Sequence, residues 1–165
     1  MKEMQNPSGR AKGEFLKMNF MIPASIAMTY GLQGVNTVSS FGCAAGATTI
    51  GEAYRCVKHG YMDAMISGGA DYSANEVGLN IMDNLEQLTH EYNDRPGEAV
   101  KPFDKKRSGT VLGDGGAFVL LESLESAEKR GAKIYCEIVG YNSNCHASDH
   151  LLPNERGEET FYTLQ

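Results

Sequence analysis

Residues 34–71 carry the clearest structural pattern of this chain, GVNTVSSFGCAAGATTIGEAYRCVKHGYMDAMISGGAD. Within this stretch, residues 36–41 are rich in Val, Ser and Thr and predict a buried strand. The apolar side chains that follow recur at helical spacing, at Ala47, Ile50, Ala53, Tyr54 and Val57. The helix is expected to end at Gly60, and residues 64–67, closed by two glycines, predict a second buried strand. A strand, a helix and a second strand in this order are typical of α/β folds.

The rest of the chain continues the same alternation. Downstream, the sequence predicts a helix over 76–88, a strand over 117–121, a short charged helix over 124–130 and a strand over 134–140. Upstream, residues 19–32 predict a short helix that ends near Gly31, after a polar arm at residues 1–18. Residues 90–108 are polar, contain two prolines and predict a loop. We therefore expect an α/β fold with a largely buried sheet.

The composition excludes several classes of protein. The chain has 165 residues, of which 41% are hydrophobic and 22% charged, values near the average of globular proteins. The net charge of −6 comes without a basic stripe, so no nucleic-acid partner is expected. No stretch approaches about 18 consecutive apolar residues, and the start of the chain has no apolar core, so neither a membrane span nor a secretory signal is expected. The four cysteines are too sparse for a disulfide scaffold, and we expect reduced thiols in the cytoplasm.

Cys43 is the candidate nucleophile. It lies among the small residues 42–46, at the expected turn from strand to helix, where the backbone can bend sharply and a substrate can approach closely. A cysteine at a helix N-terminus meets unpaired N–H groups and the positive end of the helix dipole, and both favour the nucleophilic thiolate. The same N–H groups can serve as half of an oxyanion hole. Alternatively, Cys43 is a small buried residue that packs the start of the helix. Structural roles are assigned to the other three cysteines, Cys56, Cys136 and Cys145.

Two stretches of the chain together resemble one protein family. Residues 34–71 are similar to the nucleophile segment of elongating beta-ketoacyl-ACP synthases (ACP, acyl carrier protein), which are condensing enzymes of the thiolase-like superfamily. Residues 92–141 match the same family in register, YNDRPGEAVKPFDKKRSGTVLGDGGAFVLLESLESAEKRGAKIYCEIVGY. The resemblance covers roughly residues 19–156 and is specific, because several motifs agree in order and spacing. It implies a thiolase-like α/β fold with a mixed sheet and flanking helices.

The resemblance implies an acyltransferase and assigns roles to three residues. Cys43 falls on the cysteine that accepts an acyl chain from the phosphopantetheine thiol of ACP. A malonyl-ACP substrate then loses carbon dioxide, and its carbanion attacks the thioester to give a 3-ketoacyl chain. Ile81 and Met82 fall where the family lines its acyl pocket with bulky side chains, although both suit the core of the helix over 76–88 equally well. The resemblance implies no metal and no organic cofactor, and a place in fatty acid or polyketide synthesis.

The chain departs from the family pattern at several points. Gly42, preceded by Phe41, stands where Ala is usual, and Ser108 replaces the usual Asp of the PFD-K-x-R-D-G motif. The HGTxTxxGD motif and the later Lys…GH motif, which hold the catalytic histidines of the family, do not occur in these 165 residues, and neither does the closing Gly-Phe-Gly turn. We therefore interpret residues 19–132 as an incomplete N-terminal synthase portion and residues 133–165 as the start of a C-terminal portion.

These departures predict how the isolated chain behaves. Without the histidines it lacks the groups that stabilise the carbanion, so it should not elongate acyl chains, although Cys43 can still be acylated. Half of a duplicated fold leaves apolar faces uncovered, so the chain should form a homodimer, aggregate or bind a complementary synthase half. ACP is the other expected partner, and a membrane is not one. The alternative function is a non-catalytic homologue that acts as a dimerisation or ACP-binding partner. A different thiolase-fold acyltransferase is disfavoured by the PFDKKR and EIVGY segments.

Two further patterns carry weaker signals. Residues 101–107 contain four basic side chains and are either a contact for the acidic ACP or a solvated loop. A second cluster could suggest zinc, but it lacks the helical spacing of a zinc motif and is interpreted as a solvated loop. Its members are Cys145, His146, Asp149 and His150.

Overall fold

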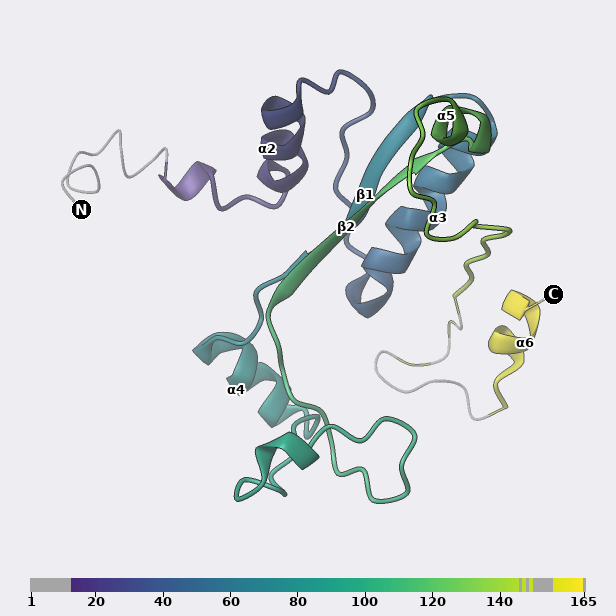
Figure 1. Ribbon diagram of the computed structural model, residues 1–165. Coiled ribbons are helices and arrows are strands. Elements are labelled where there is room, and N and C mark those ends of the chain that lie inside the picture. Colours follow the sequence, from purple (N-terminus) through teal and green to yellow (C-terminus); the bar gives the residue numbers. More distant parts are fainter. Residues whose placement is uncertain (1–12, 146, 148, 150–155, 165) are drawn as a thin grey trace. The chain divides into compact units, whose positions relative to one another are not determined.

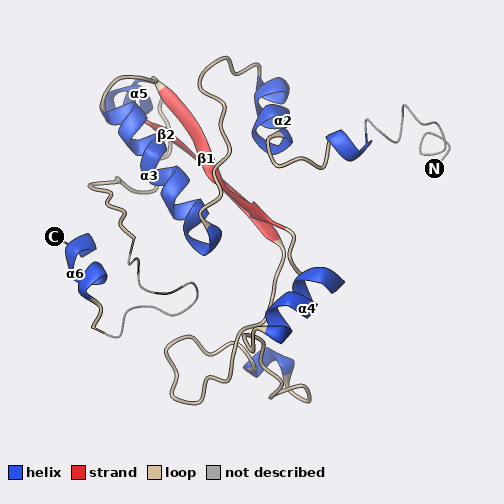
Figure 2. Ribbon diagram, turned by 180° about the vertical axis from the view of Figure 1, so that it is seen from behind, coloured by secondary structure: helices blue, strands red, loops and turns tan. Residues whose placement is uncertain are grey.

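The structure, a computed structural model, describes residues 13–145, 147, 149 and 156–164. Figure 1 shows the helices and strands along the chain, and Figure 2 distinguishes them by colour. The helices are α2 (Met21–Tyr30), α3 (Ala45–Lys58), α4 (Glu76–Asn84), α5 (Leu124–Lys129) and α6 (Glu158–Leu164). They are accompanied by the 3-10 turns η2 (Gly42–Ala44) and η3 (Pro96–Glu98) and by the strands β1 (Ala64–Asp71) and β2 (Gly115–Glu122).

The chain divides into two compact units. The first unit contains the residues up to Met65 and those from Leu121 onward, and it holds η2, α3 and α5. The second unit is Ile66–Leu120, and it holds α4 and η3. The domain boundary expected near residue 132 stays a prediction.

β1 and β2 pair in a two-stranded sheet. Gly68 lies against Ala117 and Phe118, whereas Gly116 lies against Ala70. Because the later residue of one strand faces the earlier residue of the other, the two strands run antiparallel.

The helices expected from the sequence are confirmed, with changed ends. α2 ends at Gly31, which adopts a left-handed φ of 66°, and α3 ends just ahead of Gly60. α4 stops at Asn84, short of the expected end at residue 88. α6 was not predicted. None of the helices in the described part of the chain is long and apolar enough to cross a membrane.

Side-chain caps begin α4 and α5. The side-chain oxygen of Asn75 accepts the backbone N–H groups of Val77 and Gly78, each at 3.1 Å. The hydroxyl of Ser123 accepts the N–H of Ser126 at 3.2 Å. The first N–H groups of a helix have no partner within the helix, so these caps fix where each helix begins.

Two of the four expected strands are confirmed, and two are wrong. The strands over 64–67 and 117–121 form within β1 and β2. Residues 36–41 and 134–140 do not pair with any other described segment. A strand exists only where a neighbour satisfies its backbone N–H and C=O groups. In the second of these segments the Val139 carbonyl instead accepts a hydrogen bond from the Tyr54 hydroxyl at 3.3 Å.

The expectation of a largely buried sheet is wrong for the described residues. Along β2, Leu121 is buried, whereas Phe118 and Val119 are exposed. The buried hydrophobic residues in the described ranges are Met21, Ala53, Ala99, Leu121 and Ala127. A sheet of this class is buried when helices cover both of its faces, and the described helices leave most of this sheet accessible.

Candidate active site around Cys43

Cys43 lies in η2, immediately before α3, and its thiol is free and exposed. The turn is closed by the Gly42 carbonyl, which accepts the backbone N–H of Ala45. The predicted helix follows the thiol, but the predicted strand before it does not form. Cys43 is therefore presented by a 3-10 turn between a segment without regular secondary structure and a helix, and it is exposed.

The backbone around Cys43 has an unusual conformation at the preceding residue. Gly42 has a φ of 57°, in the left-handed region, whereas Phe41 has a φ of −116°. A Cβ added to Gly42 would meet no atom within 4 Å. The conformation of the backbone, and not a lack of space, is therefore what favours glycine at this position.

The start of α3 favours negative charge. The first turn of this described helix contains no acidic side chain, and no side chain caps it. Arg55 and Lys58 occupy the last turn, where positive charge is favourable. The N–H groups at the beginning of a helix and the positive end of its dipole attract anions. An oxyanion formed next to Cys43 would gain from both.

The segment around Val139 holds α3 from one side. In addition to the bond between Tyr54 and Val139, the guanidinium of Arg55 lies 4.9 Å from the centre of the Tyr141 ring. The same ring packs directly on Gly51, where an added Cβ would lie 2.1 Å from a ring carbon. These contacts fix the helix that begins next to Cys43.

Ile81 and Met82, the predicted pocket residues, lie on α4. Ile81 is exposed and Met82 is half-buried. Both belong to the second unit, whereas Cys43 belongs to the first. Their role at the acyl chain stays a prediction.

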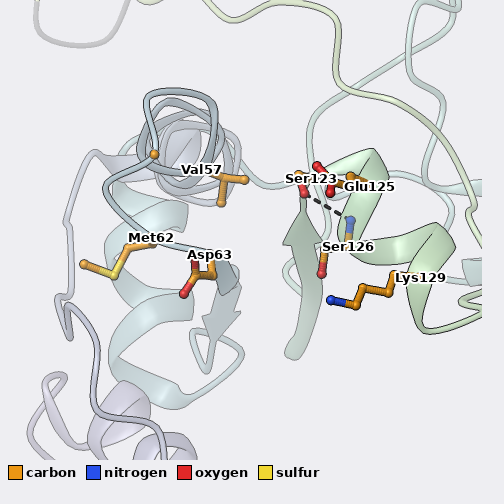
Figure 3. Close-up of a pocket in the computed structure, with 8 residues that line it drawn as sticks. Val57, Met62, Asp63, Ser123, Glu125, Ser126 and Lys129 are labelled. Atoms are coloured by element: carbon orange, nitrogen blue, oxygen red, sulfur yellow. Dashed lines mark hydrogen bonds between the residues drawn. The ribbon is translucent and has the colours of Figure 1, made fainter.

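The first unit also contains an open hollow of about 430 Å³ (Figure 3). Val57 and Met62 lie on one side of it, and Ser126 and Lys129 of α5 lie on the other. The hollow adjoins the C-terminal end of α3, a helix of 14 residues. At about 1.5 Å per residue, that end is roughly 21 Å from the end that follows Cys43. The hollow is therefore not the place where Cys43 would react.

Residues 101–107, the basic loop, form an exposed surface of the second unit. The loop surrounds Tyr92: the Lys101 ammonium lies 4.2 Å from the centre of its ring, and the Tyr92 hydroxyl donates to the Lys106 carbonyl at 3.4 Å. Phe103 is fully exposed on the loop and has a left-handed φ of 65°. The sequence analysis singled out the basic residues of this loop and made no prediction for Phe103.

Ser108 closes the base of this loop. Its hydroxyl lies 2.5 Å from the Thr89 hydroxyl, and Thr110 pairs with Leu88 in an isolated parallel bridge. The uncharged side chain of Ser108 thus forms a hydrogen bond with a second hydroxyl group, that of Thr89.

Of the residues considered for zinc, His146 and His150 lie outside the described residues, and no group of three possible metal ligands occurs within the described ranges.

Comparisons with known proteins agree on one family. Residues 2–127 match the model of the beta-ketoacyl synthase N-terminal domain. The chain is 42% identical over 149 residues to 3-oxoacyl-acyl-carrier-protein synthase 2 of Synechocystis, covering 84% of this chain and 35% of that protein. It is 35% identical over 150 residues to a putative mitochondrial 3-oxoacyl-acyl-carrier-protein synthase of Schizosaccharomyces pombe, covering 90% of this chain and 35% of that protein. The chain thus spans about a third of the length of these relatives.

Solved structures give the same result for the fold. A beta-ketoacyl synthase from Burkholderia phymatum matches with a TM-score of 0.74 and 33% identity, over 81% of this chain and 32% of that one. A type II polyketide ketosynthase, solved in complex with its acyl-carrier protein, matches with a TM-score of 0.69 and 32% identity, over 72% of this chain and 29% of that one. These matches confirm the thiolase-like α/β fold expected from the sequence.

Proposed function

Because the chain belongs to the beta-ketoacyl synthase family, we propose that it carries the acyl-accepting part of a 3-oxoacyl-ACP synthase, with Cys43 as the nucleophile. The observation that carries this proposal is the exposed, free thiol of Cys43 on the turn that leads into α3. It lies within the residues that match the family model.

The first reaction is transfer of an acyl chain to Cys43. The thiolate attacks the carbonyl carbon of an acyl chain held as a thioester on the phosphopantetheine of ACP. A carbon–sulfur bond forms, and negative charge develops on the carbonyl oxygen near the start of α3. When the oxyanion collapses, the bond to the pantetheine sulfur breaks and that sulfur leaves as a thiolate, which takes up a proton. The product is an acyl thioester on Cys43.

Condensation needs further groups. Decarboxylation of malonyl-ACP produces a carbanion, and stabilising it requires positioned hydrogen-bond donors. The 165 residues contain neither histidine motif expected for this role. We propose that this chain by itself accepts an acyl group but does not extend it. In the complete reaction the carbanion would attack the thioester carbon and release the Cys43 thiolate.

ACP is the proposed source of the acyl chain. The basic loop offers positive charge around an exposed aromatic ring, Phe103, a combination suited to an acidic partner with some apolar surface. A solved relative of this chain is a ketosynthase in complex with its acyl-carrier protein. The loop and this relative together support ACP as the partner.

Acyl transfer tests the proposal directly. The chain is incubated with octanoyl-ACP, and the mass of the intact protein and of its cysteine peptides is measured. We expect one octanoyl group on the Cys43 peptide, none in Cys43→Ala and normal loading in the control Cys56→Ala. Loading spread evenly over the four cysteines would contradict the proposal. Binding of ACP without any transfer would instead support a non-catalytic, ACP-binding homologue.

A further inference from the structure

We propose that Phe103 is the apolar anchor through which the basic loop holds ACP, while the basic side chains around it attract the carrier. The inference rests on the proposed function, in which ACP delivers the acyl chain. The side chain of Phe103 is fully exposed, so packing within the described residues does not account for it. A single exposed apolar residue needs no explanation by itself. The backbone at this position is what makes Phe103 unusual.

Phe103 stands at the position of its turn where a bulky side chain is least favourable. The N–H of Asp104 donates to the Lys101 carbonyl at 3.2 Å and closes a four-residue turn. Pro102 has a φ fixed near −65°, and Phe103 has a φ of 65°, so the turn is type II. The third residue of such a turn is usually Gly or Asn, and a bulky residue there is an outlier. Outliers of this kind occur mainly where a chain contacts a ligand or partner.

The turn that carries Phe103 is held on both sides. On one side, the Lys101 ammonium lies over the Tyr92 ring, and the Lys101 side chain is only 20% exposed. On the other side, the Asp104 carboxylate accepts the backbone N–H of Lys106 at 2.7 Å. The backbone around Phe103 is therefore already ordered, so little conformational entropy is lost when a partner covers the ring.

The charge around Phe103 indicates which partner fits. Residues 101–107 contain four basic side chains and one acidic side chain, that of Asp104. Within the described ranges, neither Lys105 nor Lys106 forms an ion pair, so their charge is available to a partner. A basic rim around an aromatic centre suits an acidic protein with some apolar surface. The solved relative in complex with its acyl-carrier protein favours ACP over a second copy of this chain.

The test uses two variants of the full chain that suit the turn but lack the ring, Phe103→Gly and Phe103→Asn. Phe103→Leu keeps an apolar side chain. Isothermal titration calorimetry measures binding of ACP that carries phosphopantetheine but no acyl chain, and circular dichroism measures the melting temperature. We expect the Gly and Asn variants to bind about tenfold more weakly yet melt no lower than the unchanged protein, and the Leu variant to bind within about threefold. A purely structural residue would lose affinity only where stability falls.

Two controls separate the ring from the charges. Tyr72 is also exposed in the second unit but lies outside the loop, so Tyr72→Ala should leave ACP binding unchanged. At about 1 M salt, where charges are screened within about 3 Å, the affinity ratio between the unchanged protein and Phe103→Gly should persist. Burial of an apolar ring is not screened by salt. A loss that disappears at high salt would assign the effect to the basic side chains and overturn the role of Phe103.

The remaining outcomes also decide. Equal binding by the unchanged protein and the Gly and Asn variants, or no binding of ACP to the unchanged protein, would overturn the anchor. Loss of self-association in Phe103→Gly with ACP binding kept would assign the ring to a second copy and overturn it as well. Failure of the proposed function is distinguishable. A protein that binds ACP in the predicted order but takes no octanoyl group at Cys43 would refute only the acyl-acceptor role. Octanoyl loading of Cys43 with equal ACP binding by every variant would refute only the anchor.

Discussion

At the scale of single residues, Ile81 gives the sharpest test of the proposed acyl pocket. It is 55% exposed on α4, so its replacement should leave the fold intact. If Ile81 lines the acyl chain, Ile81→Trp fills that space and lowers octanoyl loading of Cys43 about tenfold, or roughly 1.4 kcal/mol. Loading of the two-carbon acetyl group should be unchanged, because it does not reach the side chain. The initial rate of thioester formation with each acyl-ACP, followed by mass spectrometry, checks this.

The matched control is Leu79→Trp, since Leu79 is also exposed on α4 but has no predicted role at the acyl chain. It should not affect either substrate. Equal losses with both chain lengths, or equal effects at the two positions, would mean that Ile81 only packs its helix. The same comparison applies to Met82, where Met82→Ala should favour longer chains.

At the scale of helices and strands, the ion pair between Glu122 and Arg130 joins the end of β2 to the residue after α5. The guanidinium of Arg130 donates to both carboxylate oxygens, and the Ser126 hydroxyl donates to one of them at 2.8 Å. These hydrogen bonds, chiefly those of Arg130, hold the pKa of Glu122 below its ordinary value of 4.5. Because the native pKa is the lower one, the pair stabilises the fold above about pH 4.5 and loses this effect as the pH falls through the lowered pKa.

Arg130→Met should therefore lower the melting temperature near neutral pH by a few degrees at most, as for other exposed ion pairs. The deficit should shrink as the pH falls below 4.5, where protonation of Glu122 removes the pair from the unchanged protein as well. Thermal unfolding followed by circular dichroism over this range measures the effect. Lys129→Met removes the same charge and should show no such trend. A deficit that is constant with pH would count against the ion pair.

The basic loop makes a second prediction at this scale. Lys105→Glu combined with Lys106→Glu should slow octanoyl transfer from ACP several-fold at low salt, because the charge that attracts the carrier is reversed. The difference should disappear at about 1 M salt, where the screening length falls to about 3 Å. Octanoyl-pantetheine, which lacks the carrier, should load both proteins equally. If the loss persists with octanoyl-pantetheine, the loop does not act through the carrier.

At the scale of the whole molecule, the accessible apolar side chains predict association. Large hydrophobic residues are exposed on several elements, among them Val38, Ile81, Phe118 and Val119. Soluble monomers rarely leave extensive apolar surface uncovered, and covering it is the main driving force of association. In size-exclusion chromatography with light scattering, the chain should elute as a dimer, as larger species or, when coexpressed with it, in complex with a complementary synthase half. A compact, soluble monomer would contradict this, and an unrelated α/β protein serves as the coexpression control.

The sequence predicted the helices well because their signals are local. Gly31 and Gly60 lie just after the ends of α2 and α3, and Ser123 lies at the start of α5. Strands carry no such local information. Residues 36–41 have the composition of a strand, but pairing depends on a second segment that composition cannot identify.

The candidate site was predicted in part. The sequence placed Cys43 at the start of a helix, and the structure has it one short turn earlier, exposed. The sequence shows that Gly42 departs from the family pattern, but its left-handed φ is visible only in the structure of the backbone. The contact between Tyr141 and Gly51 joins residues far apart in sequence, and no pattern in either segment predicts it.

The contact between Tyr141 and Gly51 means that a substitution at residue 51 can affect the position of the helix that follows Cys43. An aromatic ring rests on bare helix backbone at Gly51, so any larger residue there would push Tyr141 away from α3. Residue 51 lies eight positions, or about 12 Å, along the chain from Cys43 at 1.5 Å per residue. Relatives of this protein that differ at residue 51 would thus differ in how firmly the helix behind the thiol is seated, even where every atom that touches the acyl group is the same.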